Sequence, residues 1–440
     1  MMHACRRSFS SGRGKSHHAT LDVTRCCFGY PSRSDSVLFH VNLRVVGVRH
    51  IGKMRRRSGF FRKVRAADRK RREVLLFARA MESKAHPILA QIIPIRRCNL
   101  ACSYCNEYDA VSKPVPLQEM LKRIDRLGEF GTSIITLSGG EPLLHPQCEE
   151  MISRIRKVGA MATVITNGYL LTPDKIGALN DAGLDYLQIS IDNVQPDETS
   201  KKSLKVLDKK LEWLAQHAEF AVTINTVLGA DVRHPEDALT IARRARALGF
   251  NSTVGILHDA SGQTKPLPPI QIETYQQIRK LETSVFSFSH FDRFQTKLVQ
   301  GLPNEWHCRA GSRFLYICED GLVHYCSQQR GHPGTPLATY TKEDLEREFH
   351  TEKACAPHCS ISCVHQVAML DDVREHPREM LVELVARRRE TDPSFQLPLP
   401  LRAAEWAFLD NPKRAEALGR VAGALLRTGA SRSAITNFDE

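Results

Sequence analysis

The chain has 440 residues, of which 42% are hydrophobic and 25% charged, a composition typical of a folded protein with room for two or three structural units. Its formal net charge is +13, but residues 1–80 alone hold 20 Lys and Arg against 4 Asp and Glu. The remaining residues hold 42 basic and 45 acidic side chains. The charge therefore gives no reason to class the rest of the chain as a nucleic-acid-binding protein.

The chain contains 13 cysteines, and nine of them fall in two groups, at residues 98–105 and 308–363. Such grouping in a long chain favours metal binding over disulfide bonds. Residues 1–30 lack the apolar segment of a secretory signal, and no stretch approaches the ~18 apolar residues of a membrane span. We therefore expect a reducing, cytoplasmic compartment and no membrane span.

Residues 1–80 combine Ser, His, Lys and Arg, with basic runs at 55–57 and 69–72. This composition suits a tail that binds nucleic acid or another anionic surface. It also suits a disordered leader, or upstream sequence wrongly joined to the gene. We favour a disordered leader or wrongly joined sequence over a binding tail, because so few apolar side chains cannot bury enough surface to fold. Met81 would then be a natural start, a few residues before the first expected strand.

From residue 90 onward, short β-rich segments alternate with amphipathic helical patterns. The expected strands are residues 90–95, 133–137, 162–166, 185–191, 221–227 and 252–257. The expected helices are residues 117–130, 148–158, 173–182, 201–217 and 235–248. This alternation predicts an α/β fold with a parallel sheet and right-handed crossovers. Periodicity alone leaves open whether the sheet is doubly wound or forms a barrel.

Small or polar residues follow four of these strands. They are Gly139, Gly140 and Glu141 after the second, Asn167 after the third, Ser190 and Asp192 at the fourth, and Asn225 at the fifth. Each could simply end a strand or make a turn, but parallel α/β proteins place their active sites at the carboxyl ends of strands. The first cysteine group follows the first strand. We therefore expect all these side chains at one edge of the sheet.

The C-terminal part of the chain predicts smaller elements. They are a helix at 271–285, an aromatic-rich span at 286–294, two strands at 314–318 and 322–326, a helix at 342–350, and charged helices to the end with a strong helix-forming run at 415–427. The two strands flank Asp320 and Gly321, which favour a tight hairpin turn. The expected division is a leader at 1–80, a core at 81–290, a second cysteine-containing unit at 300–372 and C-terminal helices at 373–440.

Cys98, Cys102 and Cys105 lie on one loop with the spacing C-x3-C-x2-C. Three thiolates this close can hold one [4Fe–4S] cluster, and the fourth iron would then have no protein ligand. An open coordination position is where a metal site can do chemistry. A zinc half-site or unrelated thiols are the alternatives, but no fourth partner follows before Cys148.

This loop and the motifs after it resemble the radical S-adenosylmethionine (radical SAM) superfamily. The resemblance implies a partial (β/α)6 TIM-type barrel over roughly residues 88–260. It implies that Cys98, Cys102 and Cys105 hold a [4Fe–4S] cluster whose fourth iron binds the amino and carboxylate groups of S-adenosylmethionine (SAM). The implied SAM contacts are Tyr104 and the backbone near Gly255 at adenine, Gly139, Gly140 and Glu141 at the methionine amino group, Ser190 and Asp192 at ribose or the methionine carboxylate, and Asn167 and Asn225 as further strand-end contacts.

The activity that the resemblance implies is one-electron cleavage of SAM to a 5′-deoxyadenosyl radical, which removes hydrogen from a substrate. The cluster and SAM would carry this step, while the protein supplies orientation and a dry cavity. The electron would come from a reductant such as flavodoxin or ferredoxin. A general base is not required, so its absence from the motifs is no argument against an enzyme.

The spacing from Cys308 through Gly321 to Cys326 resembles the start of the auxiliary-cluster extension in the SPASM and twitch branches of that superfamily. The full SPASM pattern has further cysteines, whereas this chain offers only Cys355, Cys359 and Cys363, with three-residue gaps. The resemblance therefore implies one auxiliary [4Fe–4S] cluster, on Cys308, Cys326 and two of the last three cysteines. It forms part of a small C-terminal extension built from a β-hairpin and a helix.

Nearby histidines and one further cysteine raise the question of which residues of this second group bind a metal. A zinc ion is the alternative occupant, and His358 or His365 could then be ligands, although a histidine near cysteines is more often only a neighbour. Cys318 lies within an expected strand and is predicted to be a buried structural thiol.

The substrate is less constrained than the cofactor. The resemblance to the SPASM and twitch branches implies a substrate among peptides, carbohydrates and small metabolites, and we rank modification of a peptide or protein first. A lipid is the close alternative, because the motif Gly-Gly-Glu-Pro and the final cysteines also resemble the hopanoid-adenosylating branch, and a small metabolite is another. A non-enzymatic alternative is an iron–sulfur or zinc module that binds nucleic acid through the basic leader.

Overall fold

The computed structural model describes residues 59–229, 232–257, 264–281, 293–391 and 393–397, together with residues 399, 402 and 406. The chain divides into two units, Met1–Lys53 and Met54–Glu440, and all the described residues belong to the second. Most of the predicted aromatic span at 286–294 and the helix predicted at 415–427 lie outside the described residues. No helix in the described part of the chain is long and apolar enough to cross a bilayer.

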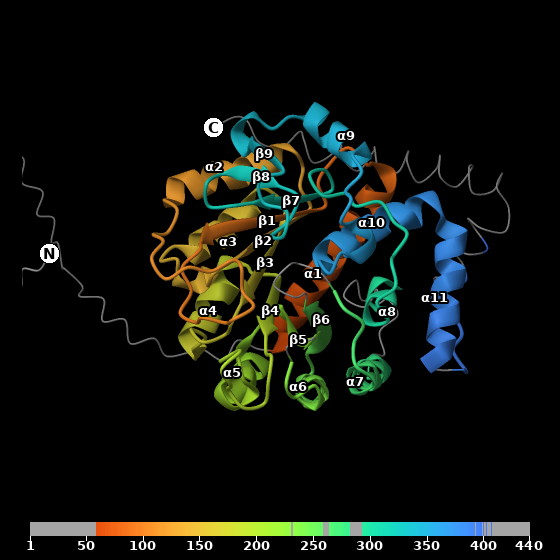
Figure 1. The fold of residues 1–440 in the computed structure, drawn as a ribbon. Helices are drawn as coiled ribbons and strands as arrows, with labels where there is room; N and C mark the ends of the chain where they lie inside the picture. The colour runs from red at the N-terminus through yellow and green to blue at the C-terminus, as the bar shows by residue number, and fades with distance from the viewer. Residues whose placement is uncertain are drawn as a thin grey trace, which may run out of the picture. The chain divides into compact units, whose positions relative to one another are not determined.

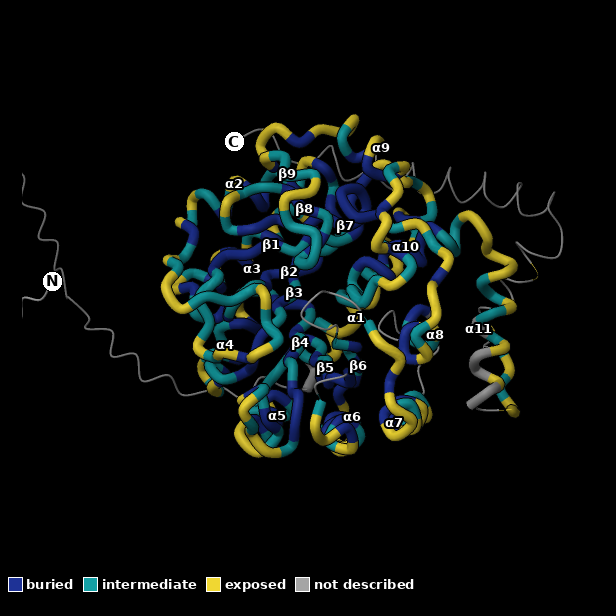
Figure 2. The backbone as a smooth tube through the Cα atoms, viewed as in Figure 1, coloured by how far each residue is buried: buried dark blue, intermediate teal, exposed yellow. Residues whose placement is uncertain are grey.

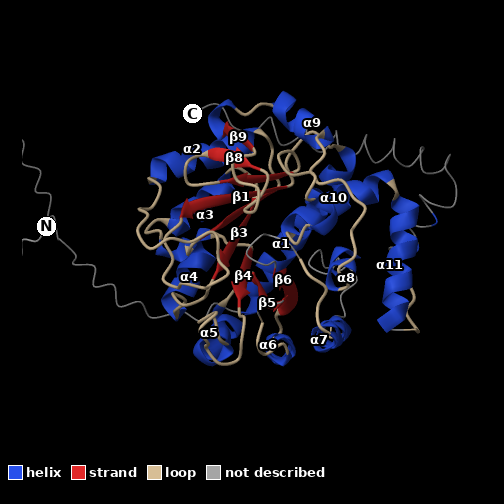
Figure 3. Ribbon diagram, viewed as in Figure 1, coloured by secondary structure: helices blue, strands red, loops and turns tan. Residues whose placement is uncertain are grey.

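A nine-stranded, open sheet forms the centre of this unit (Figures 1 and 3). Its strands are β1 (Leu89–Ile95), β2 (Ile134–Gly139), β3 (Met161–Thr166), β4 (Tyr186–Ser190), β5 (Ala221–Gly229), β6 (Asn251–Leu257), β7 (Phe314–Ile317), β8 (Leu322–His324) and β9 (Pro333–Pro336). Their order is β6-β5-β4-β3-β2-β1-β7-β8-β9. The pairs from β6 to β7 are parallel, and the last two pairs are antiparallel. The predicted α/β class with a partial, unclosed barrel is confirmed.

The helices that link the parallel strands lie at the expected places. They are α2 (Leu117–Glu129), α3 (Cys148–Lys157), α4 (Pro173–Ala182), α5 (Leu204–His217) and α6 (Glu236–Ala247). The remaining helices are α1 (Gly59–Glu82), α7 (Pro269–Lys280), α8 (Arg293–Val299), α9 (Lys342–His350), α10 (Ser362–Glu375) and α11 (Pro377–Thr391). Short 3-10 turns are η1 (Pro142–Leu144), η3 (Leu337–Thr339) and η4 (Ala356–His358).

The two faces of the parallel sheet differ in polarity. On β4, Leu187 and Ile189 are buried in a core cluster with Ile176 of α4 and Leu207 of α5, and helices α2 to α6 follow one another along that side of the sheet (Figures 1 and 2). The alternate residues of β4, including Ser190, are only partly buried. Since side chains alternate across a strand, the face away from these helices is left partly polar.

The predicted hairpin is present as β7 and β8, which pair antiparallel. The hydrophobic pattern gave no indication that β7 also pairs with β1, in parallel, with Leu89 opposite Phe314. Phe314 packs with Ile88, Ile93 and Val367 of α10 in a second core cluster. The hairpin therefore continues the same sheet.

Residues 1–80 were predicted to be a disordered leader, but residues 59–80 belong to helix α1 and pack against the core. Arg72 forms a two-pronged contact with Asp185, which directly precedes β4, at 2.5 and 2.9 Å. Arg65 reaches Glu219, just before β5, at 2.9 Å. The composition argument placed these arginines in a disordered leader, whereas they pair with two buried carboxylates, Asp185 and Glu219. Helix α1 thus crosses the amino-terminal ends of β4 and β5.

Replacing Arg72 with Met should lower the free energy of unfolding by about 2 kcal/mol, because Asp185 would lose its two-pronged partner and keep only Arg156 and a backbone N–H. Arg71→Met is the matched control, since the Arg71 side chain is 65% exposed and that of Arg72 is 15% exposed. The control should stay within about 0.5 kcal/mol of the original protein. Denaturant unfolding of the full chain measures both, and equal stability of the two variants would show that α1 is not docked as described.

Candidate active site

The cysteine loop (residues 98–105) begins directly after β1. Its base is closed by the backbone, because Cys98 N–H donates to Asp109 O at 3.2 Å and Asp109 N–H donates to Arg96 O at 3.0 Å. Cys102 is 8% exposed, and Cys98 and Cys105 are partly buried. Burial raises the pKa of the Cys98 and Cys105 thiols. A metal must therefore displace their protons on binding, which makes metal affinity dependent on pH.

The arrangement of these thiols bears on which metal they suit. Ligand sulfurs on one tetrahedral zinc ion would lie about 3.8 Å apart, given a Zn–S distance of about 2.3 Å. Within the described ranges, the three cysteines of the loop do not form a group whose ligand atoms converge within 4.8 Å. Each thiolate of a cubane binds a different iron, whereas the ligands of one zinc ion must converge on the same atom.

Gly139 and Gly140 hold the cysteine loop against the end of β2. Gly140 N–H donates to Ile95 O and Glu141 N–H donates to Arg97 O, both at 3.1 Å. A Cβ on Gly140 would overlap the carbonyl oxygens of Arg96 and Arg97. Gly139 has φ +116°, a conformation that favours glycine. The two glycines thus allow two backbones to cross directly under the thiols.

Glu141 is fully buried, and its carboxylate already has three protein donors. Oε1 accepts from Leu143 N–H at 3.0 Å and Thr166 Oγ1 at 2.7 Å, while Oε2 accepts from Asn167 N–H at 2.8 Å. Burial raises the pKa of Glu141, and these hydrogen bonds oppose the rise. A carboxylate has about four acceptor positions, so one remains on Oε2 for a further donor.

Asn167 lies between Glu141 and the cysteine loop. Its Nδ2 donates to Asn99 Oδ1 at 2.7 Å and approaches Cys98 Sγ at 3.6 Å. Its Oδ1 accepts from Tyr169 N–H at 3.0 Å. The side chain therefore connects the end of β3 to the first thiol.

Asp192 follows β4 and is 6% exposed. Its Oδ2 meets three side chains: Tyr104 OH at 2.5 Å, Ser200 Oγ at 2.7 Å and Lys202 Nζ at 3.0 Å. Its Oδ1 is buried without a hydrogen-bond partner among the described residues. A buried carboxylate oxygen is rarely left unpaired, so this atom is suited to accept from a bound hydroxyl or amino group.

Lys202 is a residue of this site that the sequence did not reveal. The pattern predicted a helix from 201, but α5 begins at Leu204, because Asp192 N–H donates to Lys202 O and Leu204 N–H donates to Asn193 O. This pairing keeps residues 200–203 beside the cysteine loop, where Ser103 N–H donates to Thr199 O at 3.1 Å and Ser200 Oγ lies 3.5 Å from Cys102 Sγ. Two adjacent lysines before a helix are the weak signal that could have drawn attention to it.

Ser190, Asn225 and Thr253 lie side by side on β4, β5 and β6, on the partly polar face of the sheet. Thr253 Oγ1 and Asn225 Oδ1 are 3.0 Å apart. Gly255, two residues further along β6, would place a Cβ 3.4 Å from Asn225 Nδ2. A narrow cleft nearby is lined by Tyr104, Asp192, Ser200, Val227 and Leu257, among others. The expected SAM contacts thus fall along one edge of the sheet and the cysteine loop.

The C-terminal cysteine group (Cys308, Cys326, Cys355, Cys359 and Cys363) comes from three places. Cys308 precedes β7, Cys326 follows β8, and the others lie around η4 and the start of α10. Burial raises the pKa of Cys308, Cys326 and Cys363 to about 11, and the Cys355 thiol adds to the rise at Cys308 and Cys326. Burial also raises the pKa of Cys359, and the thiols of Cys308, Cys326 and Cys355 add to that rise. The Cys355 thiol thus raises the pKa of three other thiols, Cys308, Cys326 and Cys359, while the pKa of Cys363 is raised by Glu107 and Cys326.

The histidines near this group have other surroundings. The His365 ring stacks on Phe294 at 4.4 Å and meets Trp306 edge-on at 4.8 Å. Burial lowers the pKa of His365 to about 3. His358 is exposed. An aromatic packing role for His365 gives the zinc alternative less support.

Cys318, Asp320 and His324 form a separate group whose potential ligand atoms lie within 4.8 Å. His324 Nδ1 accepts from Gly331 N–H at 2.8 Å, so the neutral ring carries its proton on Nε2, which lies 3.8 Å from Asp320. Neither nitrogen then has a free lone pair for a metal. This group lies at the β7–β8 hairpin, and Cys318 is buried there, as predicted.

Glu107 connects the cysteine loop to the C-terminal cysteine group. It lies two residues after Cys105, and its Oε1 accepts from Tyr316 OH of β7 at 2.7 Å. Arg330 Nη2 reaches the same hydroxyl at 3.3 Å. Burial raises the pKa of Glu107. The negative charge of Glu107 raises the pKa of Cys326 and Cys363. One carboxylate therefore lies between the two sets of thiols.

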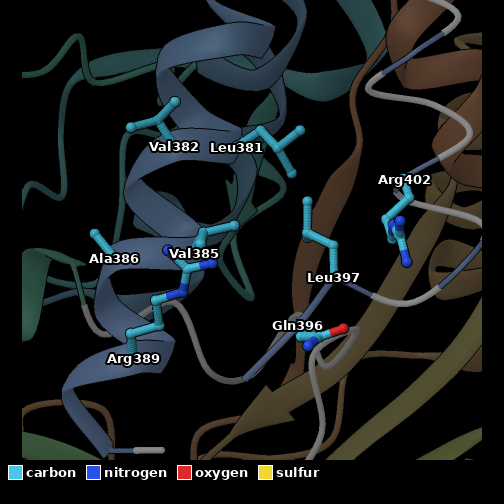
Figure 4. A pocket seen from close by; sticks show the side chains of 8 residues that line it. All are labelled: Leu381, Val382, Val385, Ala386, Arg389, Gln396, Leu397 and Arg402. Atoms are coloured by element: carbon cyan, nitrogen blue, oxygen red, sulfur yellow. The ribbon is translucent and has the colours of Figure 1, made fainter. Parts of the chain in front are cut away.

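A cleft of about 490 Å³ lies away from these thiols, between α11 and the segment after it (Figure 4). Its lining is Leu381, Val382, Val385, Ala386, Arg389, Gln396, Leu397 and Arg402. None of these described lining residues is a cysteine or a carboxylate, whereas the cysteine-loop edge holds both, so we assign the chemistry to that edge.

Comparison with known proteins bears on this site. The family model described as the radical SAM superfamily matches residues 92–259, which include the cysteine loop and all six core strands in whole or in part. GTP 3′,8-cyclase of Aquifex aeolicus is 31% identical over 266 residues, which cover 54% of this chain and 81% of that protein. The chain belongs to the radical SAM superfamily. The resemblance drawn from the cysteine loop is confirmed.

Other radical SAM proteins match over shorter portions. PqqA peptide cyclase of Bradyrhizobium diazoefficiens is 32% identical over 149 residues, which cover 32% of this chain and 39% of that protein. The chain therefore spans less than half the length of that relative. The structure of SuiB from Streptococcus suis bound to S-adenosylmethionine aligns with 15% identity and a TM-score of 0.43, covering 55% of this chain and 60% of that chain. The family assignment depends on the sequence matches.

Gly140→Ala should prevent the cysteine loop from seating on β2, because the new methyl group would overlap two carbonyl oxygens. We expect iron bound after anaerobic reconstitution to fall by about four atoms per chain, the content of one cubane. Gly177→Ala in α4 is the control, since its Cβ would meet nothing within 4 Å and alanine favours a helix. Iron analysis of both variants measures the effect. Full iron content in Gly140→Ala would contradict the described crossing.

Proposed function

We propose that this radical SAM protein is an enzyme that uses one iron–sulfur cluster to cleave SAM reductively. When bound, the reduced cluster would supply one electron to the sulfonium of SAM, whose C–S bond would break to give methionine and a 5′-deoxyadenosyl radical for hydrogen abstraction from a substrate. The observation that supports this most strongly is the cysteine loop seated on Gly139 and Gly140. Beside it lies the buried carboxylate of Asp192, whose Oδ1 has no partner among the described residues. The donor set and the surrounding polar atoms fit both groups.

The residues proposed to hold the cluster are Cys98, Cys102 and Cys105. The loop's tight closure on Arg96 and Asp109 fixes all three thiols on one short segment. Asn167, beside Cys98, supplies a donor that would stabilise a thiolate sulfur. An external electron donor, of the flavodoxin or ferredoxin kind, is required for this role.

SAM would bind along the carboxyl edge of the sheet. Asp192 Oδ1 is the proposed acceptor for a ribose hydroxyl, because the other oxygen is already saturated. Glu141 keeps one acceptor position for the methionine amino group, and the surfaces at Gly139 and Gly140 lie beside it. Ser190, Asn225 and Gly255 then line the nucleoside side, and Tyr104 covers it through its ring.

The C-terminal cysteine group is proposed to hold an auxiliary [4Fe–4S] cluster on Cys308, Cys326, Cys355 and Cys359, with Cys363 outside the ligand set. Four thiolates would leave no iron open, which favours electron relay over substrate binding. Residues 300–372 would form this auxiliary unit, and 81–290 the SAM-binding core.

The proposed substrate class is a peptide or protein. Similarity to PqqA peptide cyclase supports it. Similarity to GTP 3′,8-cyclase, over a larger share of that protein, favours a small metabolite as the second candidate. The test incubates the reduced protein with SAM and a deuterated peptide or a deuterated small metabolite. Deuterium transfer into 5′-deoxyadenosine shows which of the two substrate classes is used.

Cys102→Ala should abolish 5′-deoxyadenosine formation and remove about four of about eight irons per chain, because a cubane held by two thiolates is not retained. Cys148→Ala is the control, as Cys148 is a buried residue of α3 outside both cysteine groups. Anaerobic reconstitution, iron analysis and chromatography of the products give the measurement. The assignment is wrong if Cys102→Ala still forms 5′-deoxyadenosine.

Cys359→Ala should remove the auxiliary cluster, which is again about four irons, whereas Cys363→Ala and Cys318→Ala should retain it. Iron content and the Mössbauer spectrum of each variant test the proposed ligand set. Loss of iron from Cys363→Ala with full retention by Cys359→Ala would reverse the assignment.

A further inference from the structure

Lys202 is a cation enclosed beside the cysteine loop. Its side chain is only 13% exposed, and its Nζ lies 3.0 Å from Asp192 Oδ2. The same ammonium group contacts the Tyr104 hydroxyl and lies 5.0 Å from the centre of the Tyr104 ring. Burying an ammonium group is costly unless it is paired, so this position is one that the surrounding structure supports specifically.

The ammonium group stabilises an arrangement that spans two loops. Asp192 Oδ2 gathers Tyr104 from the cysteine loop and Ser200 and Lys202 from the segment after β4. Without Lys202, the buried carboxylate would keep only neutral donors and would be poorly compensated. The hydrogen bond from Ser103 N–H to Thr199 O joins the same two segments. Lys202 therefore favours the position in which the cysteine loop is held.

Ser200 connects this arrangement to a thiol of the loop, because its Oγ lies 2.7 Å from Asp192 Oδ2 and 3.5 Å from Cys102 Sγ. Asp192, Tyr104 and Cys102 all favour the charged form of Lys202, and together they outweigh burial, so its pKa is raised. By contrast Arg96, at the start of the loop, is paired with Glu319 at 3.3 Å. A cubane with three thiolates becomes more negative when it accepts an electron. A fixed positive charge in a poorly solvated site favours that reduced state.

We propose that Lys202 is a positioning residue that holds the cysteine loop on Asp192 and raises the reduction potential of the cluster on Cys98, Cys102 and Cys105. This inference depends on the proposed cluster, but not on SAM cleavage or on the identity of the substrate. Tyr104 contributes to the position of the loop, whereas the charge belongs to Lys202. The two effects can therefore be separated by substitution.

The test compares Lys202→Met with Lys202→Arg and Lys201→Met in the reconstituted full chain. Lys201 is the matched control, because it is adjacent and exposed. An EPR-monitored redox titration without SAM measures each potential, and the auxiliary cluster serves as an internal reference. We expect Lys202→Met to lower the ratio of reduced to oxidised cluster about tenfold at fixed potential, equivalent to about 59 mV for one electron. Lys202→Arg and Lys201→Met should match the original protein.

An unchanged potential in Lys202→Met with full iron content would overturn the electrostatic role. If Lys202→Met binds no iron, hydrogen exchange in the full chain without metal decides. Faster exchange at the Ser103 amide in Lys202→Met, but not in Lys201→Met, would support the positioning role, and equal exchange would overturn it. If the potential shifts as expected but the original protein forms no 5′-deoxyadenosine, the proposed function fails while the role of Lys202 stands.

Discussion

The parallel pairing of β1 with β2 on one side and β7 on the other determines where both cysteine groups lie. The cysteine loop leaves the carboxyl end of β1, and the hairpin that separates Cys308 from Cys326 is hydrogen-bonded to its other edge. Tyr316 of β7 then reaches Glu107 at 2.7 Å, beyond the third thiol. Because strand pairing fixes backbone register, a slip of β7 would both move the cysteines that flank the hairpin, Cys308 and Cys326, and break this contact.

The site itself depends on buried polar groups that the protein satisfies only in part. Glu141 has three donors and Asp192 has three on one oxygen, which holds each carboxylate in a fixed orientation. One acceptor on each remains for a ligand. Prepositioned acceptors of this kind need little rearrangement on binding. The apolar core between the sheet and α2 to α6 supplies the rigidity that keeps them in place.

Much of this architecture could be predicted from the sequence, because its signals are local. The periodicity gave α4 and α9 their observed bounds and placed six strands to within a few residues. The resemblance of the loop with Cys98, Cys102 and Cys105, and of the motifs after it, to the radical SAM superfamily was confirmed. Features set by distant partners were missed: α1 folds because Arg65 and Arg72 meet Glu219 and Asp185, far along the chain. Lys202 was read as part of a helix, since no pattern shows its backbone pairing with Asp192.

The most direct test of the central claim is the magnetic coupling between the reduced cluster and isotopically labelled SAM. With nitrogen-15 in the amino group and oxygen-17 in the carboxylate, electron–nuclear spectroscopy of the reduced protein should show both nuclei coupled to the cluster on Cys98, Cys102 and Cys105. The same coupling should be absent in Cys102→Ala. A reduced cluster of full iron content that shows no coupling to either nucleus would contradict an open iron at the cysteine loop.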